Sequence, residues 1–293
     1  MWIPYGLSAP LKAETSRATV EASERDSGPR PMLIGFFLSD PVSRGREIDA
    51  ASASMGEPLE LVLEGHEARL SLHGGEAGKI NEAVYQITAR SLAEALEIGR
   101  RDLEARLSRW ALQMGRGASV AGWRVADPTH GAVWRCAPFR PSALDLDPAA
   151  LDSAPPEAAP FLELYRRARN ASDPAWRLLC ACGILRAWRA GEAPFDAGFA
   201  QRRVGFQDLL QSGALVCAGD LRDQPLEALM TRLEALRGEI LRMLEAPGEA
   251  ASFSPAASES LAQMANLADL LAREGLRGAL GLKAGAPAAA AAS

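Results

Sequence analysis

The chain has few of the side chains that most often carry acid–base, nucleophilic or metal-binding chemistry. Its 293 residues include three histidines and four cysteines. The cysteines are Cys136, Cys180, Cys182 and Cys217. So few cysteines exclude a disulfide scaffold. Cys180 and Cys182 lie two apart in an apparent helix, so their side chains point about 200° apart and cannot chelate one ion together. We predict that both are small core residues.

The chain also lacks a long apolar run. The longest, residues 178–185, is far shorter than the roughly 20 residues that a membrane-spanning helix needs. The first residues, MWIPYGLSAPLK, place no basic segment before an apolar one and include Pro4 and Pro10, so they do not resemble a secretory signal. We therefore expect a cytoplasmic protein with reduced thiols and no membrane contact.

Net positive charge is absent as well. The chain has 32 Lys and Arg residues against 37 Asp and Glu residues, which gives a formal net charge of −5. This balance argues against a general nucleic-acid binder, whose binding domain is usually strongly basic. With 48% hydrophobic and 24% charged residues, the composition is that of an ordinary globular protein with a sizeable core.

No catalytic motif is found. The segment GGEAGK at residues 74–79 superficially resembles a phosphate-binding loop. However, His73 stands where the loop requires its first glycine, and Ile80 replaces the Ser or Thr that would hold magnesium. No G-x-S-x-G nucleophile elbow occurs either. We therefore predict turn glycines here, and neither catalytic residues nor a cofactor elsewhere.

One group of residues allows a metal site to be considered. His66 and His73 flank a predicted hairpin, with Glu64, Glu67 and Glu76 nearby in the sequence. A histidine and carboxylate site is geometrically conceivable there. A turn histidine in an acidic loop is usually only solvated, however, and no paired cysteine motif accompanies it. We predict that the protein holds no metal.

Composition divides the chain into two regions of different character. Residues 141–160, PSALDLDPAALDSAPPEAAP, are rich in proline, alanine and acidic residues, as linkers are. We predict an α+β domain over residues 1–140, a linker over 141–160, a helical bundle over 161–280 and a disordered Ala-rich tail over 281–293.

The N-terminal domain is predicted to hold a small antiparallel sheet. A β-branched and aromatic run indicates a strand over residues 30–39, and a similar run indicates another over 81–89. Alternating apolar residues within 59–72 surround a turn at 64–67 and predict a hairpin. A second hairpin is predicted around residues 127–131.

One long helix accompanies this sheet. Its apolar stripe covers residues 92–114, and Gly115 is placed to end it. Ser91 and Glu94 form a capping box at its start. A long helix across a small antiparallel sheet is the economical α+β arrangement.

Beyond residue 155 the apolar period is helical throughout. The clearest helix begins at Asp173 and Pro174, carries Trp176 in its stripe and ends at Gly191. The other predicted helices lie near residues 161–168, 206–210, 225–244 (with a stripe ending at Leu244) and from 254 onward. Four to five amphipathic helices joined by short loops predict a bundle.

Arginine is concentrated in the first part of this bundle. The eight arginines are Arg166, Arg167, Arg169, Arg177, Arg186, Arg189, Arg202 and Arg203. Within the stretch, acidic residues occur only at Asp173, Glu192 and Asp196. Such a patch can bind an anionic ligand or an acidic protein surface, because the guanidinium fork matches carboxylate and phosphate. The alternative, which we favour, is a solvated face whose arginines pair with acidic helices elsewhere.

Three segments of the chain are similar to a known family. They are MWIPYGL, KINEAVYQITARSLAEALEIGRRDLEARLSRW and FLELYRRARNASDPAWRLLCACGILRAW. All three resemble MauJ, a family of methylamine utilisation proteins found with the genes for methylamine dehydrogenase in methylotrophic bacteria. The resemblance covers nearly the whole chain. It implies a cytoplasmic accessory protein whose partner is another protein of the methylamine dehydrogenase pathway.

The C-terminal half also resembles a HEPN-type bundle, the fold of several RNA-cleaving toxins and their non-catalytic relatives. Those enzymes carry an arginine followed about five residues later by a histidine. The matching segment here runs from Arg237 to Arg242, so arginine stands at the histidine's place. Arginine stays protonated and cannot act as a base, so the resemblance implies the fold without the nuclease activity.

Together these observations favour a non-enzymatic accessory protein of methylamine utilisation. The alternative is a HEPN-like, RNA-directed protein, either a ribonuclease or a degenerate toxin or antitoxin partner. The candidate residues for binding an anion or a partner are Arg166, Arg167, Arg169, Arg177, Arg237 and Arg242. The sequence leaves the oligomeric state open.

Overall fold

The computed structural model describes residues 12–41, 47–52, 54–75, 78–136, 154–195, 197–246 and 255–282. These residues form two compact units, the first ending at Cys136 and the second beginning at Ala154. Most of the predicted linker and the predicted tail lie outside the described residues. No helix among the described residues combines the length and apolarity needed to cross a bilayer.

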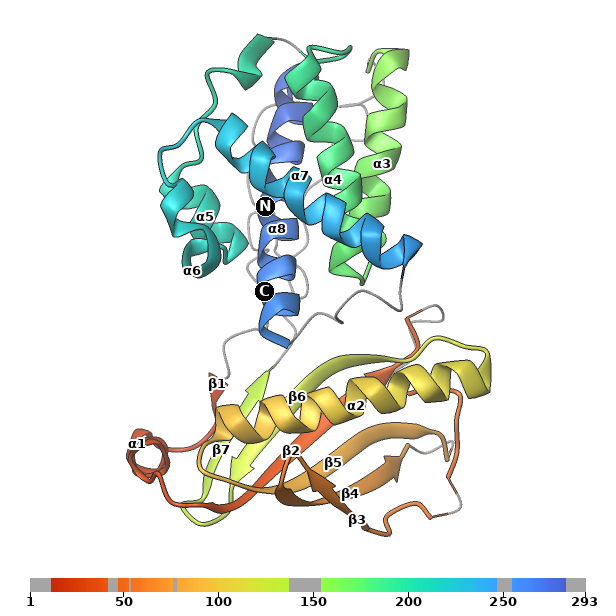
Figure 1. Ribbon diagram of the computed structural model, residues 1–293, viewed down its shortest axis with the longest axis vertical. Helices are drawn as coiled ribbons and strands as arrows, with labels where there is room; N and C mark the ends of the chain where they lie inside the picture. Colours follow the sequence, from red (N-terminus) through yellow and green to blue (C-terminus); the bar gives the residue numbers. More distant parts are fainter. Residues whose placement is uncertain are drawn as a thin grey trace, which may run out of the picture. The chain divides into compact units, whose positions relative to one another are not determined.

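The first unit is built around a seven-stranded antiparallel sheet with the strand order β1-β7-β6-β2-β5-β4-β3 (Figure 1). The strands are β1 (Lys12–Ala13), β2 (Arg30–Ser39), β3 (Leu59–Leu63), β4 (His66–Gly74), β5 (Ile80–Ala89), β6 (Ser119–Asp127) and β7 (Ala132–Cys136). The two predicted hairpins are therefore confirmed as β3–β4 and β6–β7. Helix α1 (Arg17–Arg25), which the sequence did not indicate, lies beside β7.

Helix α2 (Leu92–Met114) runs across one face of this sheet, as predicted (Figure 1). Gly115 ends it in a left-handed conformation (φ 64°). Ser91 accepts a hydrogen bond from the Glu94 amide, but the Glu94 carboxylate accepts from the Arg90 amide instead of closing the reciprocal bond to Ser91. Only one half of the predicted capping box is therefore formed.

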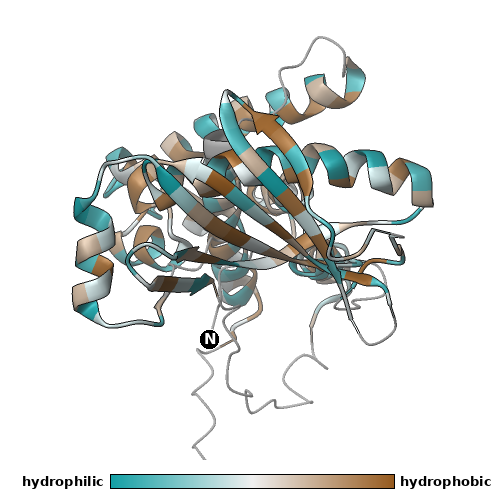
Figure 2. Cartoon of the chain, turned by 90° about the horizontal axis from the view of Figure 1, so that it is seen from below, coloured by the Kyte–Doolittle hydropathy of each residue, from teal (hydrophilic) through white to brown (hydrophobic). Residues whose placement is uncertain are grey.

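The two faces of the sheet differ because successive side chains of a strand point to opposite sides. On β2, Met32, Ile34, Phe36 and Leu38 are buried in the same apolar cluster as the inner residues of α2. Figure 2 shows the resulting alternation of apolar and polar residues along the strands. The first unit thus has a hydrophobic core of its own, between the sheet and α2.

The described residues of the second unit contain helices and no strand. The helices are α3 (Ala159–Asn170), α4 (Pro174–Ala190), α5 (Phe206–Ser212), α6 (Leu215–Ala218), α7 (Leu226–Glu245) and α8 (Pro255–Ala279). Helix α4 begins after the N-cap Asp173 with Pro174 in its first turn and ends at Gly191, as predicted. The combination of a sheet-bearing unit and a helical unit confirms the α+β class.

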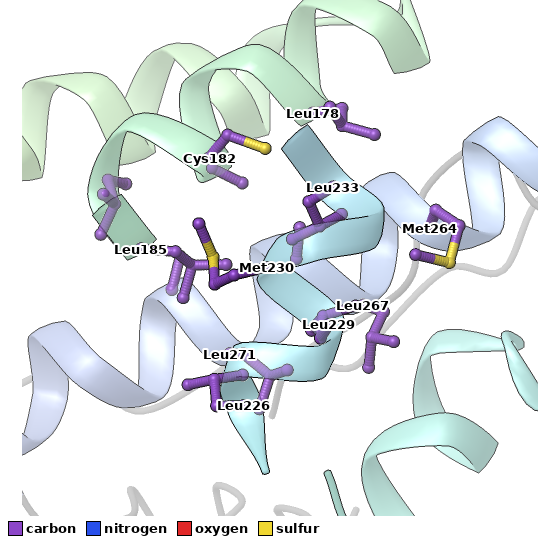
Figure 3. Close-up of a cluster of buried hydrophobic side chains, with 14 of the residues drawn as sticks. Leu178, Cys182, Leu185, Leu226, Leu229, Met230, Leu233, Met264, Leu267 and Leu271 are labelled. Atoms are coloured by element: carbon purple, nitrogen blue, oxygen red, sulfur yellow. The ribbon is translucent and has the colours of Figure 1, made fainter. Parts of the chain in front are cut away.

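The core of the second unit lies where α4, α7 and α8 meet. Figure 3 shows Leu178 and Leu185 from α4 close to Leu229 and Leu233 from α7 and Leu267 from α8. Cys180 and Cys182 are also buried, which confirms their prediction as core residues.

Two assignments to the apolar stripes of this unit are wrong. Trp176 is half exposed and Leu244 is largely exposed. Each lies near one end of its helix, where fewer neighbouring helices are available to cover the stripe.

Candidate functional site

The six arginines predicted as candidates do not form one site. Arg166, Arg167 and Arg169 lie on α3, and Arg177 lies on α4. The remaining two, Arg237 and Arg242, lie on α7. Their surroundings separate them into a buried group, a paired surface group and a group on α7, and each group has different chemistry.

Arg169 and Arg177 belong to a buried polar array with Asn266 and Asp269 of α8. Arg169 Nη1 donates to Asp269 Oδ2 at 2.7 Å, and Arg177 Nη1 donates to Asn266 Oδ1 at 3.1 Å. Arg177, Asn266 and Asp269 are essentially inaccessible to solvent. Removing one member of such a buried pair leaves an uncompensated charge, so the array ties α3 and α4 to α8.

Tyr165 of α3 lies within electrostatic reach of this array. Burial raises the pKa of its hydroxyl, and the negative charge of Asp269 raises it further. Tyr165 therefore stays neutral under physiological conditions. The sequence held a signal for the array that composition alone does not reveal: Asn266 and Asp269 interrupt the apolar run MANLADLLA at helical spacing.

Arg166 and Arg167 form a paired group on the surface of α3. Both guanidinium groups donate to the carboxylate of Glu163, at 2.7 and 2.9 Å. These hydrogen bonds lower the pKa of Glu163 to about 2. Two exposed arginines share one carboxylate, so this turn of α3 keeps a positive charge that faces solvent.

Arg237 and Arg242 lie on the surface of α7. Arg242 donates to the carbonyl of Gly238 at 3.4 Å, one turn earlier in the helix. Arg237 lies within electrostatic reach of the buried thiol of Cys182 on α4. Burial raises the pKa of Cys182 to about 12, and the positive charge of Arg237 opposes this rise only in part. The Cys182 thiol is therefore protonated at neutral pH and is not nucleophilic.

A shallow hollow of about 400 Å³ lies beside α4, near the end of that helix. Arg186, Arg189 and Glu192 contribute its charged groups, and Phe161 of α3 contributes an aromatic side. Arg189 is held by Glu227 and Glu234 of α7, at 3.2 and 2.7 Å. Pairing with acidic residues of another helix is the outcome that the sequence favoured for such arginines.

The first unit contains a second buried charge, which the sequence did not reveal. Asp127 is fully buried, and its Oδ2 accepts hydrogen bonds from Ser23 at 2.6 Å and from Arg30 at 2.8 Å. His130 Nδ1 lies 2.9 Å from the same oxygen. Burial by itself raises the pKa of a carboxyl group, but these hydrogen bonds outweigh it and hold the pKa of Asp127 below its ordinary value of 3.8.

The histidines that were considered for a metal site lie apart from any ligand set in the described structure. His66 Nδ1 lies 2.9 Å from the carbonyl oxygen of Thr88, and its Nε2 lies 3.9 Å from Glu94. His73 is exposed on β4. Among the described residues, no group of three histidine, cysteine, aspartate or glutamate side chains could hold a metal ion.

An apolar surface on α5 and α6 is the feature of the second unit that sequence reasoning missed most clearly. Phe206 and Leu210 lie one turn apart on α5, and Leu215 and Val216 lie on the contacting helix α6. All four are exposed, Leu210 by 51% and Val216 by 93%. We call these four residues the α5–α6 patch. Short helices without a clear stripe gave no sequence signal for it.

Arg222 borders the patch. Its guanidinium carbon lies 5.2 Å from the centre of the Phe206 ring, within the range of a cation–π contact. Exposed apolar side chains that gather on neighbouring elements mark interaction surfaces, whereas single ones are ordinary. The patch is therefore the best candidate for a binding surface in this unit.

Comparison with known proteins identifies relatives over nearly the full chain. Residues 5–136 match the family model described as "Methylamine utilization protein MauJ, N-terminal domain". The protein named methylamine utilization protein MauJ from Methylorubrum extorquens is 48% identical over 279 residues, which cover 94% of this chain and 95% of the relative.

Proteins of the same name from two Paracoccus species are similar over comparable lengths. The one from Paracoccus versutus is 42% identical and aligns over 93% of this chain and 92% of its own. The one from Paracoccus denitrificans is 41% identical and aligns over 98% of both chains. No solved structure matches. The resemblance of the helical unit to a HEPN bundle thus stays a prediction.

Proposed function

The chain belongs to the MauJ family of methylamine utilization proteins, and on this premise we propose that it is a non-enzymatic accessory protein of methylamine utilisation. It acts in the cytoplasm by binding another protein of the methylamine dehydrogenase pathway. The α5–α6 patch is the binding surface.

The exposure of the patch is the observation that carries this proposal. Val216 is 93% exposed, and Leu210 is half exposed on the adjoining helix. Single exposed apolar side chains are ordinary, but four on two contacting helices favour a partner surface, because their burial there is worth roughly 25 cal/mol per Å² of apolar area. An apolar partner surface matches this chemistry, with an acidic residue placed to meet Arg222.

We also propose that the positively charged surface of α3 contributes to partner binding. Arg166 and Arg167 are exposed, and both pair with the single carboxylate of Glu163. Charges at the rim of an interface mainly accelerate association and select partners of opposite charge. Arg237 and Arg242 on α7 are proposed to act in the same way. Arg169 and Arg177 belong to the buried array and are structural.

The test is affinity capture of the tagged chain from methylotrophic cells grown on methylamine, compared with the Val216→Asp variant. We expect the wild-type chain to retain a protein encoded with methylamine dehydrogenase and the variant to lose it, because a desolvated carboxylate in an apolar interface is costly. Leu112→Asp is the matched control, since Leu112 is 86% exposed on α2, outside the patch. It should leave capture unchanged.

Two results would contradict the proposal. The first is equal capture by the wild-type chain and the Val216→Asp variant, which would remove the patch from partner binding. The second is turnover of methylamine or formaldehyde by the purified chain, which would make it an enzyme. Unchanged thermal unfolding of both aspartate variants shows that the comparison concerns the surface and not the fold.

A further inference from the structure

The sheet of the first unit has an open edge at β3. In the described structure, β3 pairs with β4 on one side and forms no ladder on the other. Its exposed side chains include Leu59, at 51%, and Val62, at 76%. Natural proteins protect such an edge with short strands, charged side chains (lysine above all), proline or a bulge, because its free backbone groups can pair with another strand. The sequence of β3, LELVL, has no lysine, proline or bulge, and its one charged residue, Glu60, pairs with Arg69 of β4.

The turn that joins β3 to β4 settles which backbone groups are free. Glu64 and Gly65 both have positive φ, 52° and 86°, as in a two-residue type I′ turn. The residues that flank such a turn, Leu63 and His66, form a hydrogen-bonded pair. Because the bonding direction alternates, Leu59 and Leu61 also bond to β4, while the amide and carbonyl groups of Glu60 and Val62 point outward.

Charge then selects among the symmetric ways in which two β3 strands can pair antiparallel. Pairing centred on Glu60 places the two Glu60 carboxylates opposite each other. Pairing centred on Val62 places Glu60 opposite Glu64 of the second copy. Pairing centred on Leu61 places Glu60 opposite Val62 of the second copy and sets no like charges directly opposite each other; the two Glu60 residues are then only diagonal neighbours, about 7–8 Å apart.

The Leu61-centred pairing is also complementary in its side chains. It brings Leu61 against Leu61 of the second copy, and Leu59 against Leu63 of the second copy. These residues lie on the face of the sheet that carries α2, so the pairing extends an apolar surface that already exists. The charge of Glu60 is balanced within its own chain by Arg69, at 2.8 Å.

From these observations we infer that the protein forms a symmetric dimer in which the β3 strands of two copies pair antiparallel with Leu61 at the centre. The outward groups of Glu60 and Val62 then make four backbone hydrogen bonds across the interface, and one sheet runs through both copies. Only five residues of each strand take part, so the dimer depends on protein concentration. This inference does not depend on the α5–α6 patch.

A cysteine crosslink tests both the dimer and its register. In the inferred pairing, residue 61 faces itself at a non-hydrogen-bonded position, where Cα atoms are about 4.5 Å apart, within the range of a disulfide. Residue 62 meets its own copy only diagonally, at about 7–8 Å, which is too far. We expect Leu61→Cys to form a covalent dimer under mild oxidation, and the wild-type chain and Val62→Cys not to do so.

Crosslinking of Val62→Cys that equals that of Leu61→Cys would overturn the inference, as would no crosslink in either. A second experiment covers the case in which Leu61→Cys fails to fold. Analytical ultracentrifugation should show concentration-dependent dimers of the wild-type chain and of Val62→Thr, and loss of the dimer in Val62→Pro. Proline removes an outward amide and leaves the bonds to β4 intact. A wild-type chain that is monomeric at every concentration refutes the dimer.

Discussion

At the scale of single residues, both units bury charged groups that neighbouring elements must satisfy. In the helical unit, Asp269 is buried and accepts a hydrogen bond from Arg169, which comes from a helix about a hundred residues earlier in the chain. The carboxylate therefore links α3 to α8 through a buried ion pair. The pair matters for stability because loss of either partner would leave an unpaired charge in the interior, which is far less stable than the pair.

We predict that Asp269→Ala destabilises the helical unit by about 3–5 kcal/mol, since it leaves the largely buried guanidinium of Arg169 without its carboxylate partner. The matched control is Asp220→Ala. Asp220 also pairs with an arginine, Arg232, at 2.6 Å, but both side chains are at the surface, where water screens the pair. Urea unfolding followed by the helical circular dichroism signal measures both variants. Equal losses of stability in the two variants would show that the buried pair of Asp269 contributes no more to stability than a surface pair.

Asp127 should make the first unit sensitive to acid. Its pKa in the folded state is lowered, chiefly because hydrogen bonds from Ser23 and Arg30 outweigh the effect of burial. A lowered folded-state pKa contributes stability above the ordinary value of 3.8, and this contribution is lost as the pH falls through the folded-state pKa. We expect Asp127→Asn to be less stable than wild type at neutral pH and the difference to shrink below pH 3.8.

Chemical unfolding of the two proteins over a series of pH values measures this difference. Glu60→Gln, which removes a carboxylate at the surface, serves as the control and should show no comparable dependence. A difference between Asp127→Asn and wild type that stays constant to the lowest pH would contradict the prediction.

At the scale of elements, two helical glycines allow a matched comparison. A Cβ atom at Gly275 of α8 would lie 2.7 Å from the ring of Trp188, whereas a Cβ at Gly238 of α7 would have no neighbour within 4 Å. Alanine is the better helix former by about 1 kcal/mol. At Gly275 this gain is outweighed, because a rigid indole ring in a packed core cannot yield, and overpacking costs about 1–3 kcal/mol.

We therefore predict opposite signs for the two substitutions: Gly238→Ala raises the melting temperature and Gly275→Ala lowers it. Differential scanning calorimetry measures both. A rise in both variants would mean that Trp188 has room to move, and that α4 and α8 pack less closely at this point than the structure shows.

Most elements could be predicted from the sequence because their signals are local. The stripe and the caps of α2 and the Asp173–Pro174 start of α4 depend only on residues within one helix. Helix α1 was missed because its nine residues bury little besides Ser23, so its sequence has no apolar stripe that would indicate a helix. Trp176 and Leu244 were misplaced because the pattern of one helix does not say where its neighbours end.

The candidate sites were less predictable because they depend on pairings between distant segments. Arginine content marked α3 and α4, but nothing local says that Arg169 meets Asp269 and that Arg166 meets Glu163. The exposure of Val216 likewise follows from which helices fail to cover α6. Such facts belong to tertiary structure, and periodicity carries no information on them.

At the scale of the whole molecule, the two units have separate cores. One buried apolar cluster draws its residues from the sheet and α2, and the other draws its residues from the helical unit. The two clusters share no residue. A unit with its own core can in principle fold alone, which sets an expectation for the isolated parts.

We predict that residues 12–136 and 154–282, expressed separately, each fold and unfold cooperatively, and that their unfolding curves reproduce that of the full chain when added. A broad-specificity protease should first cut the full chain within residues 141–160 and leave two protected fragments, because the intervening segment is rich in proline, alanine and acidic residues. Calorimetry of the fragments and mass spectrometry of the digest measure both outcomes. A first cut inside Leu92–Met114, or a fragment without a cooperative transition, would show that the two cores depend on each other and that the chain folds as one unit.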